Sequence, residues 1–500
     1  MKKRAALLIG LGLILSTLGP RDANAANTLI RDLDPVVVLG SAMPDFAGVP
    51  LAQLFVYKYS GGAWSQIPWQ FDEVVGSAIV SSDNGLLDAQ DQLVFMAADA
   101  GDQAPTSAWL TDASAATFPR YELMVNDPLN ATQHAWVYVY RSLTLSSTIA
   151  TDYVSYDAAQ ALLTSDRYKL GQMTDHPAFN RLQLNGSPVN ILDRTKIRVN
   201  FFFLGLQTEM NQNTTPPVLT RAGHVRVVLN GGGILAYRAF YSNRIDVDVT
   251  SVPVPILWGR FSADLSPAAS GSLYYDPNVS GVQIDGSPTP ESVPTSLAAE
   301  WSQVSGATGT VVRIMDFSGA GGTATTYYKD NSAPDSSDTG DQMSYGDAGV
   351  RIDSPPTINK KFIFWNWNYI LPANQPNVGA TYRGYARNPL QVQATENLVA
   401  PVVTIGIPTG TTNVKLTWGA VGGATLYRVW WHSTNPYFTS GGTLVTDDPN
   451  PSDLTYTHTG AAASPTNYYY VVRAANASPA ESADSNRTGK FTFTLVPGTG

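Results

Sequence analysis

Two loops rich in acidic residues are the parts of this sequence whose residue types most directly suggest chemistry. The first, at residues 83–91, places Asp83, Asp88 and Asp91 around a glycine. Carboxylate and amide oxygens are the ligands that calcium prefers, at about 2.3 to 2.6 Å. The loop lacks the alternating acidic pattern and terminal glutamate of an EF-hand, and Asp, Asn and Gly are also common turn residues. It is therefore either a calcium site or a solvated turn.

The second loop carries four aspartates within a short stretch, namely Asp335, Asp338, Asp341 and Asp347. Their negative charges repel one another unless water or a cation separates them. A calcium site and a solvated turn again remain open, and the crowding of charge favours calcium more than in the first loop. The sequence contains no glycine-rich phosphate-binding motif, so we expect no organic cofactor.

An aromatic run at residues 362–369 is a candidate carbohydrate-binding surface. If it forms a strand, Trp365, Trp367 and Tyr369 share one face, because side chains alternate along a strand. A flat row of rings can stack on sugars. Aromatic residues on strands also pack the cores of β-sandwiches, so the same row is open to a purely structural interpretation.

Catalytic motifs are scarce, and the catalytic residues of any enzyme here are unknown from the sequence. Only five histidines occur, with no His-Glu-x-x-His and no Gly-x-Ser-x-Gly pattern. A polysaccharide lyase needs a base and a group that neutralises a carboxylate, which His176, His224 or Tyr345 and the acidic loops could supply. A glycoside hydrolase needs two carboxylates on either side of the sugar. Because the sequence has forty acidic residues, it cannot indicate which two would form such a pair.

The elements that must position these residues are strands. Runs of alternating or aromatic β-favouring residues, such as 54–59, 135–140 and 225–229, are separated by Gly, Pro, Asn and Asp. Helical periodicity is weak, and we expect one short helix at 157–163 with Asp157 as its N-cap. Parallel strands need long crossover connections, usually helices, so the sequence predicts an all-β fold of antiparallel β-sandwiches.

The N-terminal residues predict export. Basic residues 2–4 precede an apolar run too short for a membrane span, and Ala-Asn-Ala at 23–25 suits signal peptidase, so we expect residues 1–25 to be a signal peptide. No later stretch is long and apolar enough to cross a bilayer. The absence of cysteine excludes disulfides and thiolate metal sites. These features predict a secreted or extracellular bacterial protein, periplasmic in a Gram-negative organism.

The length of 500 residues exceeds one compact core, which stops growing near ~250 to 300 residues. Composition and strand spacing change near Asn397. We therefore expect a β-sandwich-like unit at 26–150, a second β-rich unit at 151–396 that can be continuous with the first, and a separate module at 397–500.

The final module resembles a fibronectin type III domain. Residues 414–418, which end in Trp418, look like its second strand, 426–431 like its third, and 468–476 like its sixth. Tyr468 matches the position of the tyrosine corner. The resemblance implies a seven-stranded immunoglobulin-type sandwich that serves as a spacer or binding platform. The preceding region is loosely similar to uncharacterised secreted bacterial proteins and to β-sandwich regions of carbohydrate-active enzymes.

The formal net charge of −9 is a poor match to a phosphate backbone, so we expect no nucleic-acid partner. We expect a non-catalytic extracellular binding protein whose partner is a polysaccharide or another cell-surface component, with calcium stiffening its loops. The alternatives are a secreted polysaccharide lyase or glycoside hydrolase with an accessory module, and a structural envelope protein.

Overall fold

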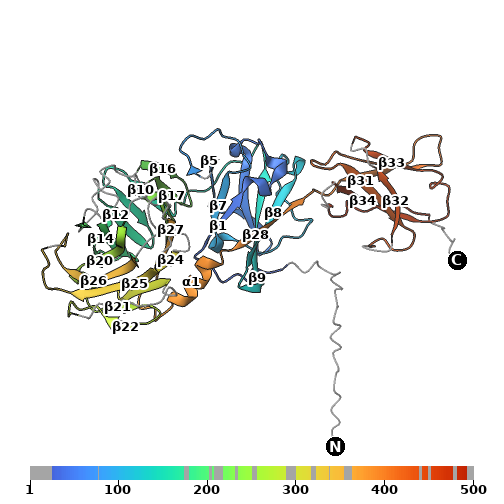
Figure 1. The fold of residues 1–500 in the computed structure, drawn as a ribbon. Coiled ribbons are helices and arrows are strands. Elements are labelled where there is room, and N and C mark those ends of the chain that lie inside the picture. The colour runs from blue at the N-terminus through green and yellow to red at the C-terminus, as the bar shows by residue number, and fades with distance from the viewer. Residues whose placement is uncertain are drawn as a thin grey trace, which may run out of the picture.

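The computed structural model shows a chain built almost entirely from antiparallel strands (Figure 1), which confirms the predicted all-β class. It describes residues 25–76, 78–173, 179–201, 205–207, 218–230, 235–250, 256–288, 300–316, 323–336, 338–353, 363–438, 442–448, 452–476 and 481–492. The predicted signal peptide lies outside these ranges, except for Ala25. No helix within them has the length and hydrophobicity that a membrane crossing requires.

The N-terminal strands form a two-sheet sandwich, which we call the first unit. Its smaller sheet has the order β1 (Pro35–Leu39), β7 (Gln92–Met96) and β4 (Gln70–Asp72), and its larger sheet has the order β28 (Gln391–Asn397), β8 (Arg120–Asp127), β9 (Asn130–Arg141), β2 (Leu54–Ser60) and β3 (Ala63–Gln66). Alternate residues such as Val36 and Val38 of β1 share a buried core with Leu123 and Val125 of β8. A short hairpin, β5 (Val74–Val75) and β6 (Ala78–Ile79), follows β4.

Strand β28 changes the predicted order of units along the chain. Its residues were expected at the end of the second unit, but they pair with β8 from Gln391 opposite Asn126 to Asn397 opposite Arg120. The chain between β9 and β28 is therefore inserted into the first unit.

This inserted region forms the second unit, a larger stack of sheets. The four-stranded sheet has the order β10 (Val154–Asp157), β11 (Leu162–Ser165), β12 (Tyr168–Gln172), β13 (Phe179–Leu184). The five-stranded sheet has the order β15 (Gly205–Gln207), β14 (Leu192–Phe201), β20 (Ile256–Leu265), β26 (Ser344–Asp353), β25 (Thr323–Asn331). The nine-stranded sheet has the order β16 (Val218–Ala222), β17 (Val227–Asn230), β18 (Leu235–Phe240), β19 (Arg244–Thr250), β27 (Ile363–Leu371), β24 (Gly309–Asp316), β23 (Trp301–Gly306), β21 (Leu273–Tyr275), β22 (Ser280–Gln283). One buried apolar cluster draws on all three sheets, for example through Leu163, Leu265 and Ile370.

Helices are short. Helix α1 spans Gly379–Arg387 and packs against β23 and β24, with Tyr382 and Ala386 joining an apolar cluster around Trp301. The sequence predicted no helix there. Short 3-10 helices within the described ranges occupy Gly40–Ala42, Pro44–Phe46, Leu51–Gln53, Ala97–Asp99, Ala115–Thr117 and Pro267–Ala269.

The helix predicted at residues 157–163 is wrong, because these residues form the turn of the hairpin β10–β11. The Asp157 carboxylate accepts hydrogen bonds from the backbone N–H groups of Ala159 and Gln160, at 2.9 and 3.2 Å. Aspartate uses the same bonds to cap helices and to close turns. The positive φ of Ala161, 47°, then directs the chain into β11.

The terminal module is a separate sandwich with its own core. Its sheets have the orders β29 (Val403–Gly406), β30 (Val414–Trp418), β33 (Thr455–His458), and β32 (Thr443–Asp448), β31 (Leu426–His432), β34 (Tyr468–Ala475), β35 (Thr488–Lys490). Trp418 is buried between them, as expected for the second strand. The Tyr468 hydroxyl lies 3.2 Å from the Ser464 hydroxyl, so this tyrosine ties the start of β34 to the preceding loop.

The terminal module contacts the first unit directly. The Asn476 amide donates a 2.5 Å hydrogen bond to the Glu396 carboxylate of β28. Gly422 lies so close to the first unit that a Cβ there would come within 2.0 Å of the Thr117 carbonyl oxygen.

Candidate functional site

One face of the five-stranded sheet of the second unit is lined mainly by polar and charged side chains, unlike the apolar face of a sheet that packs in a core. Because alternate residues of a strand share a face, the strand register places these side chains together. We call the set the polar face, and it comprises Lys196, Arg198 and Asn200 of β14, Trp258, Arg260, Ser262 and Asp264 of β20, Asp347, Arg351 and Asp353 of β26, and Thr325 and Tyr327 of β25.

The acidic end of the polar face is completely buried. Asp264 and Asp347 have exposures of 0 %. The Lys196 ammonium contacts Asp264 and lies 2.8 Å from Asp338, which belongs to the second acidic loop. Arg260 lies 3.4 Å from Asp347. The loop therefore folds over the sheet, and its aspartates meet basic side chains of β14 and β20.

Several buried oxygens on the polar face lack hydrogen bonds. No described residue hydrogen-bonds to Oδ1 of Asp264, to either carboxylate oxygen of Asp347, or to the hydroxyl of Ser262 or Thr325. Buried polar atoms are nearly always paired, since an unmade hydrogen bond costs about 1 to 3 kcal/mol. A concentration of such atoms on one face is typical of a place where polar ligand groups bind.

Burial and neighbouring charges shift the pKa values of Asp264 and Lys196 at this end of the polar face. Burial and the neighbouring Asp347 raise the pKa of Asp264 to about 9, and together they outweigh the opposing effect of Lys196. For Lys196, burial lowers the pKa, but Asp264 and Asp347 outweigh it and the net pKa is raised. Burial and the negative charge of Asp347 thus both favour the protonated form of Asp264, while Lys196 favours its ionised form.

The opposite end of the polar face is open. The Arg351 guanidinium lies 4.9 Å from the ring centre of Trp258 and 3.0 Å from Asp353, and Arg351 and Asp353 side chains are 32 % and 39 % exposed. The Arg260 guanidinium covers the Tyr327 ring at 4.4 Å and donates a 2.9 Å hydrogen bond to its hydroxyl. Aromatic rings and guanidinium groups therefore alternate along this part of the face, where Trp258 and Arg351 are partly exposed and Tyr327 and Arg260 are buried.

The predicted metal ligands of the second acidic loop separate. Asp338 pairs with Lys196 and Asp347 lies 3.4 Å from Arg260, so basic side chains already neutralise these two predicted calcium ligands. Asp341 instead joins two residues that the sequence did not suggest, because its carboxylate lies with those of Asp193 and Asp264, all within 4.8 Å of one another. The backbone N–H of Asp335 donates to the Gln342 carbonyl at 2.7 Å and closes the loop.

In the first acidic loop, Asp88 and Asp91 do come together, and Glu73 joins them. Ligand oxygens of the three lie within 4.8 Å of one another. Glu73 and Asp91 are buried, and Asp91 accepts hydrogen bonds from the backbone N–H groups of Val74 and Asp88, at 3.2 and 2.7 Å. Among the described residues no lysine, arginine or histidine forms an ion pair with any of these carboxylates. This arrangement can hold a divalent cation.

Asp83, the third predicted ligand of that loop, points elsewhere. Its carboxylate pairs with Arg221 of β16, which also lies 3.3 Å from Asp72. Asp83 therefore links the first unit to the second, because a guanidinium from the second unit satisfies its charge.

The described aromatic side chains of the β27 row differ in their exposure to solvent. Tyr369 is fully buried, so it cannot stack on a sugar, which corrects its prediction as a binding residue. Trp367 is half-buried against the cluster around Trp301. The side chain of Trp365 lies outside what the structure describes.

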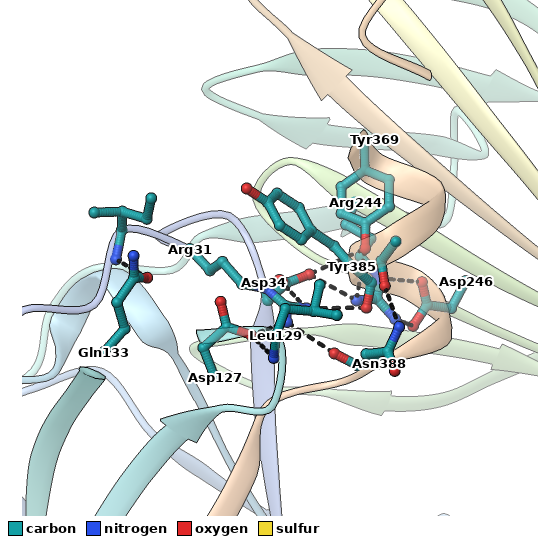
Figure 2. Close-up of polar contacts among 12 residues, drawn as sticks. Arg31, Asp34, Asp127, Leu129, Gln133, Arg244, Asp246, Tyr369, Tyr385 and Asn388 are labelled. Carbon is teal, nitrogen blue, oxygen red and sulfur yellow. Dashed lines mark hydrogen bonds and ion pairs between the residues drawn. The ribbon is translucent and has the colours of Figure 1, made fainter. Parts of the chain in front are cut away.

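Tyr369 instead belongs to a buried network between the first and second units. Figure 2 shows the Tyr369 hydroxyl directed at Asp34, which also binds Arg31 and Arg244. Arg31 further contacts Asp127 at 3.0 Å, and it donates to backbone carbonyls at the end of α1. Every charge has a partner here, so we assign the network to structure.

The structure does not bring the two described residues considered for lyase chemistry, His224 and Tyr345, into one site. His224 pairs with Asp152 at 2.7 Å on the surface. Tyr345 is buried in the core of the second unit. His176 lies outside the described residues.

The polar face itself was missed by the sequence analysis, although a signal exists. Residues 196–200 and 260–264 both alternate polar with apolar side chains, which indicates strands with one polar face. Glu73 was missed because it lies ten residues before Asp83, outside the loop.

No known protein family matches the sequence, and no curated protein matches it. Among solved structures, the chain is similar to an Fn3-like protein from Clostridium thermocellum, with 22% identity over 20% of this chain and 95% of that one, at a TM-score of 0.16. A beta-1,2-glucanase from Parabacteroides distasonis is 13% identical over 60% of this chain and 37% of that one, at a TM-score of 0.17.

The chicken CNTN1 FN1-FN3 domains are 10% identical over 64% of this chain and 96% of that one, with a TM-score of 0.16. These TM-scores are low, so the similarities assign neither a ligand nor an activity to this chain.

Proposed function

We propose that this chain is a non-catalytic extracellular binding protein that recognises a glycan on the polar face of its second unit. The observation that carries the proposal is a set of buried oxygens without hydrogen bonds, on Asp264, Asp347, Ser262 and Thr325, along the same sheet face as the partly exposed Trp258. Ligand sites combine apolar or aromatic walls with a few convergent polar groups. A sugar offers hydroxyl groups for the oxygens and an apolar ring face for the tryptophan.

A glycan array with the full chain tests this proposal. We expect binding to a restricted set of glycans and its loss in Trp258→Ala. The matched control is Tyr437→Ala, because Tyr437 is an exposed aromatic residue of the terminal module, at 76 % exposure. Failure of the wild-type chain to bind any glycan would contradict the proposal, as would equal binding by Trp258→Ala.

We further propose that Glu73, Asp88 and Asp91 bind calcium and stabilise the loop at residues 80–91. Three converging carboxylates favour a divalent cation, and calcium accepts irregular oxygen sites more readily than magnesium does. The second cluster, Asp193, Asp264 and Asp341, is less suited to a cation, because the Lys196 ammonium already contacts Asp264.

Thermal unfolding in the presence of calcium separates the two clusters. Because an ion that binds only the folded state raises Tm, we expect calcium to raise Tm of the wild type and of Asp341→Asn, but not of Glu73→Gln. No shift at millimolar calcium would contradict calcium binding. A shift lost in Asp341→Asn and kept in Glu73→Gln would move the site to the second cluster.

One observation favours an enzyme as the second candidate function. Burial raises the pKa of Asp264, the carboxyl group of Asp347 interacts with it, and glycosidases use a pair of carboxyl groups of which one has a raised pKa. Assays for new reducing ends and for unsaturated uronates, with Asp264→Asn as the inactive variant, test this candidate. Binding without product supports the binding function, whereas product that disappears in Asp264→Asn supports the enzyme.

A further inference from the structure

The amine of Lys196 meets two carboxyl groups inside the second unit, where solvent does not reach. Lys196 belongs to β14, and its ammonium contacts the carboxylate of Asp264 on the neighbouring strand β20. It also lies 2.8 Å from Oδ1 of Asp338, which belongs to the second acidic loop. The side chains of all three residues are 0 % exposed. Lys196 stands opposite Ser262 in the strand register, so Asp264 is a diagonal neighbour that a long side chain can reach.

A buried ion pair is an expensive way to join two strands. Removing both charges from water costs free energy that their mutual attraction returns only in part. A covalent amide between the same two groups carries no charge and avoids that cost. The chain contains no cysteine, so no disulfide can cross-link its strands. An amide between β14 and β20 would therefore remove buried charge and supply the covalent link that disulfides provide in other proteins.

The surroundings of the two acids favour different protonation states. Burial raises the pKa of Asp264, and the negative charge of Asp347 adds to this effect, whereas Lys196 opposes it. For Asp338, burial acts in the same direction, but the hydrogen bond and charge of Lys196 outweigh it and the net pKa is lowered. The surroundings thus favour an acid form at Asp264, whose carbon can accept a nucleophile, and a carboxylate at Asp338, which can accept a proton.

Hydrogen bonds hold the Asp338 carboxylate in position beside the amine. Its Oδ1 accepts a 2.9 Å hydrogen bond from the backbone N–H of Thr339, and its Oδ2 lies 3.2 Å from the hydroxyl of Ser344. Oδ1 of Asp264 has no hydrogen-bond partner among the described residues. Reacting groups that are already aligned need no further loss of freedom, which accelerates a reaction between them.

We propose that Lys196 and Asp264 condense to an intramolecular amide, with Asp338 as the base. The Asp338 carboxylate takes one proton from the Lys196 ammonium, and the freed Nζ attacks Cγ of the protonated Asp264. The C–N bond forms, the C–O bond to the hydroxyl breaks, and the hydroxyl leaves as water with a second proton from the nitrogen. Asp338 remains protonated, so atoms and charge balance without any further reactant.

This inference goes beyond the proposed function and does not depend on glycan binding. The amide would also remove the acidic proton of Asp264, which the second candidate function requires. Exclusion of water from the site protects the product from hydrolysis.

Intact-mass spectrometry of the full chain tests the condensation. After correction for the exchanged residue, the wild type should be lighter than Lys196→Arg by one molecule of water, because the guanidinium group keeps the charge but is not a nucleophile. Any processing of the N-terminus cancels from this difference. The matched control is Lys169→Arg, which replaces an exposed lysine of β12 in the same unit and should keep the loss of water.

Tryptic digestion of the denatured wild type locates the bond. Trypsin does not cleave after a lysine whose amine is acylated, so a branched peptide should join the segments that contain Lys196 and Asp264. Asp264→Asn should lose ammonia in place of water, since the amine then displaces a side-chain amide. Asp338→Ala should keep the full mass, because the base is missing, and circular dichroism checks that this variant is folded.

Each contrary result overturns a defined part of the inference. A wild type with the mass of the uncondensed chain, and a linear tryptic peptide ending at Lys196, would overturn the amide. A branched peptide that contains Asp338 in place of Asp264, or a loss of water that persists in Asp338→Ala, would overturn the assigned roles. The wild-type measurements stand without any variant, so a variant that fails to fold leaves the test intact.

Discussion

The Tyr369 hydroxyl donates a 3.0 Å hydrogen bond to the Asp34 carboxylate, across the junction of the first and second units. Burial raises the pKa of Tyr369 well above its ordinary value, so the phenol keeps its proton and acts as a donor. Asp34 also receives Arg31 and Arg244, at 2.8 and 3.1 Å. One carboxylate therefore holds two arginines and a phenol in place.

Replacing Asp34 should be far more damaging than replacing its phenol partner. Tyr369→Phe removes one hydrogen bond and should lower the free energy of unfolding by about 1 kcal/mol. Asp34→Ala leaves two buried arginines without this partner and should cost about 3 to 5 kcal/mol. Urea unfolding followed by circular dichroism measures both values. Equal losses would show that the carboxylate does not organise the junction.

Arg120 is predicted to stabilise the first unit through aromatic rings instead of through an acid. Its side chain is fully buried, with its guanidinium 4.6 Å from Trp109 and 5.1 Å from Tyr138, and it donates a 2.8 Å hydrogen bond to the Tyr140 hydroxyl. Cation–π contacts strengthen to about 2 kcal/mol when desolvated.

We therefore expect Arg120→Met to lower the free energy of unfolding by roughly 2 kcal/mol, as measured by urea unfolding followed through tryptophan fluorescence. Arg141→Met is the control, because Arg141 stacks on a single ring, Phe118, at 4.2 Å. A variant at position 120 as stable as the wild type would mean that burial of the charge cancels the ring contacts.

The contact between the first unit and the terminal module should depend on pH. Burial is the main cause that raises the pKa of Glu396 to about 7, and Asp45 adds to it. The folded protein thus binds this proton more tightly than the unfolded chain, whose ordinary value is 4.5. The stabilisation is complete below pH 4.5 and is lost as pH rises through 7.

Glu396→Gln isolates this contribution, since glutamine cannot ionise. We expect the difference in Tm between the variant and the wild type to shift in favour of the variant between pH 5 and pH 8, approximately the interval over which Glu396 loses its proton. A Tm difference that stays constant across this interval would show that the pKa of Glu396 in the folded protein is not raised into it.

The terminal module should fold without the rest of the chain. Its core is formed by its own residues, among them Leu416, Trp418, Val429 and Val472. A polypeptide of residues 398–500 should therefore unfold in one cooperative thermal transition, observed by circular dichroism. A gradual, non-cooperative melt would show that its contacts with Glu396 and Thr117 are required for folding.

Local patterns predicted the strands well and the helices poorly. Alternation located β2, β9 and β30, because the period of two is a property of each strand alone. Asp157 signalled a helix start, yet aspartate forms the same backbone hydrogen bonds in a turn. Helix α1 gave little signal, because packing against β23 and β24 stabilises it more than its own sequence does.

The candidate sites were predictable only in part, because they depend on which strands pair. Asp88 and Asp91 are neighbours in sequence and remain together, whereas Glu73 reaches them through the fold. Arg198, Arg260 and Arg351 form a row solely through the register of β14, β20 and β26, whose residues are far apart in the sequence. No local pattern contains that register.

The insertion of the second unit between β9 and β28 has a consequence for biogenesis. The edge of β8 stays unpaired until residues 391–397 emerge from the ribosome, so most of the polypeptide must be made before the first sheet is complete. An open strand edge invites association with other chains. A nascent chain that ends before β28 would thus expose the unpaired edge of β8, which can pair with other chains. A chaperone that covers this edge should therefore increase the yield of folded protein.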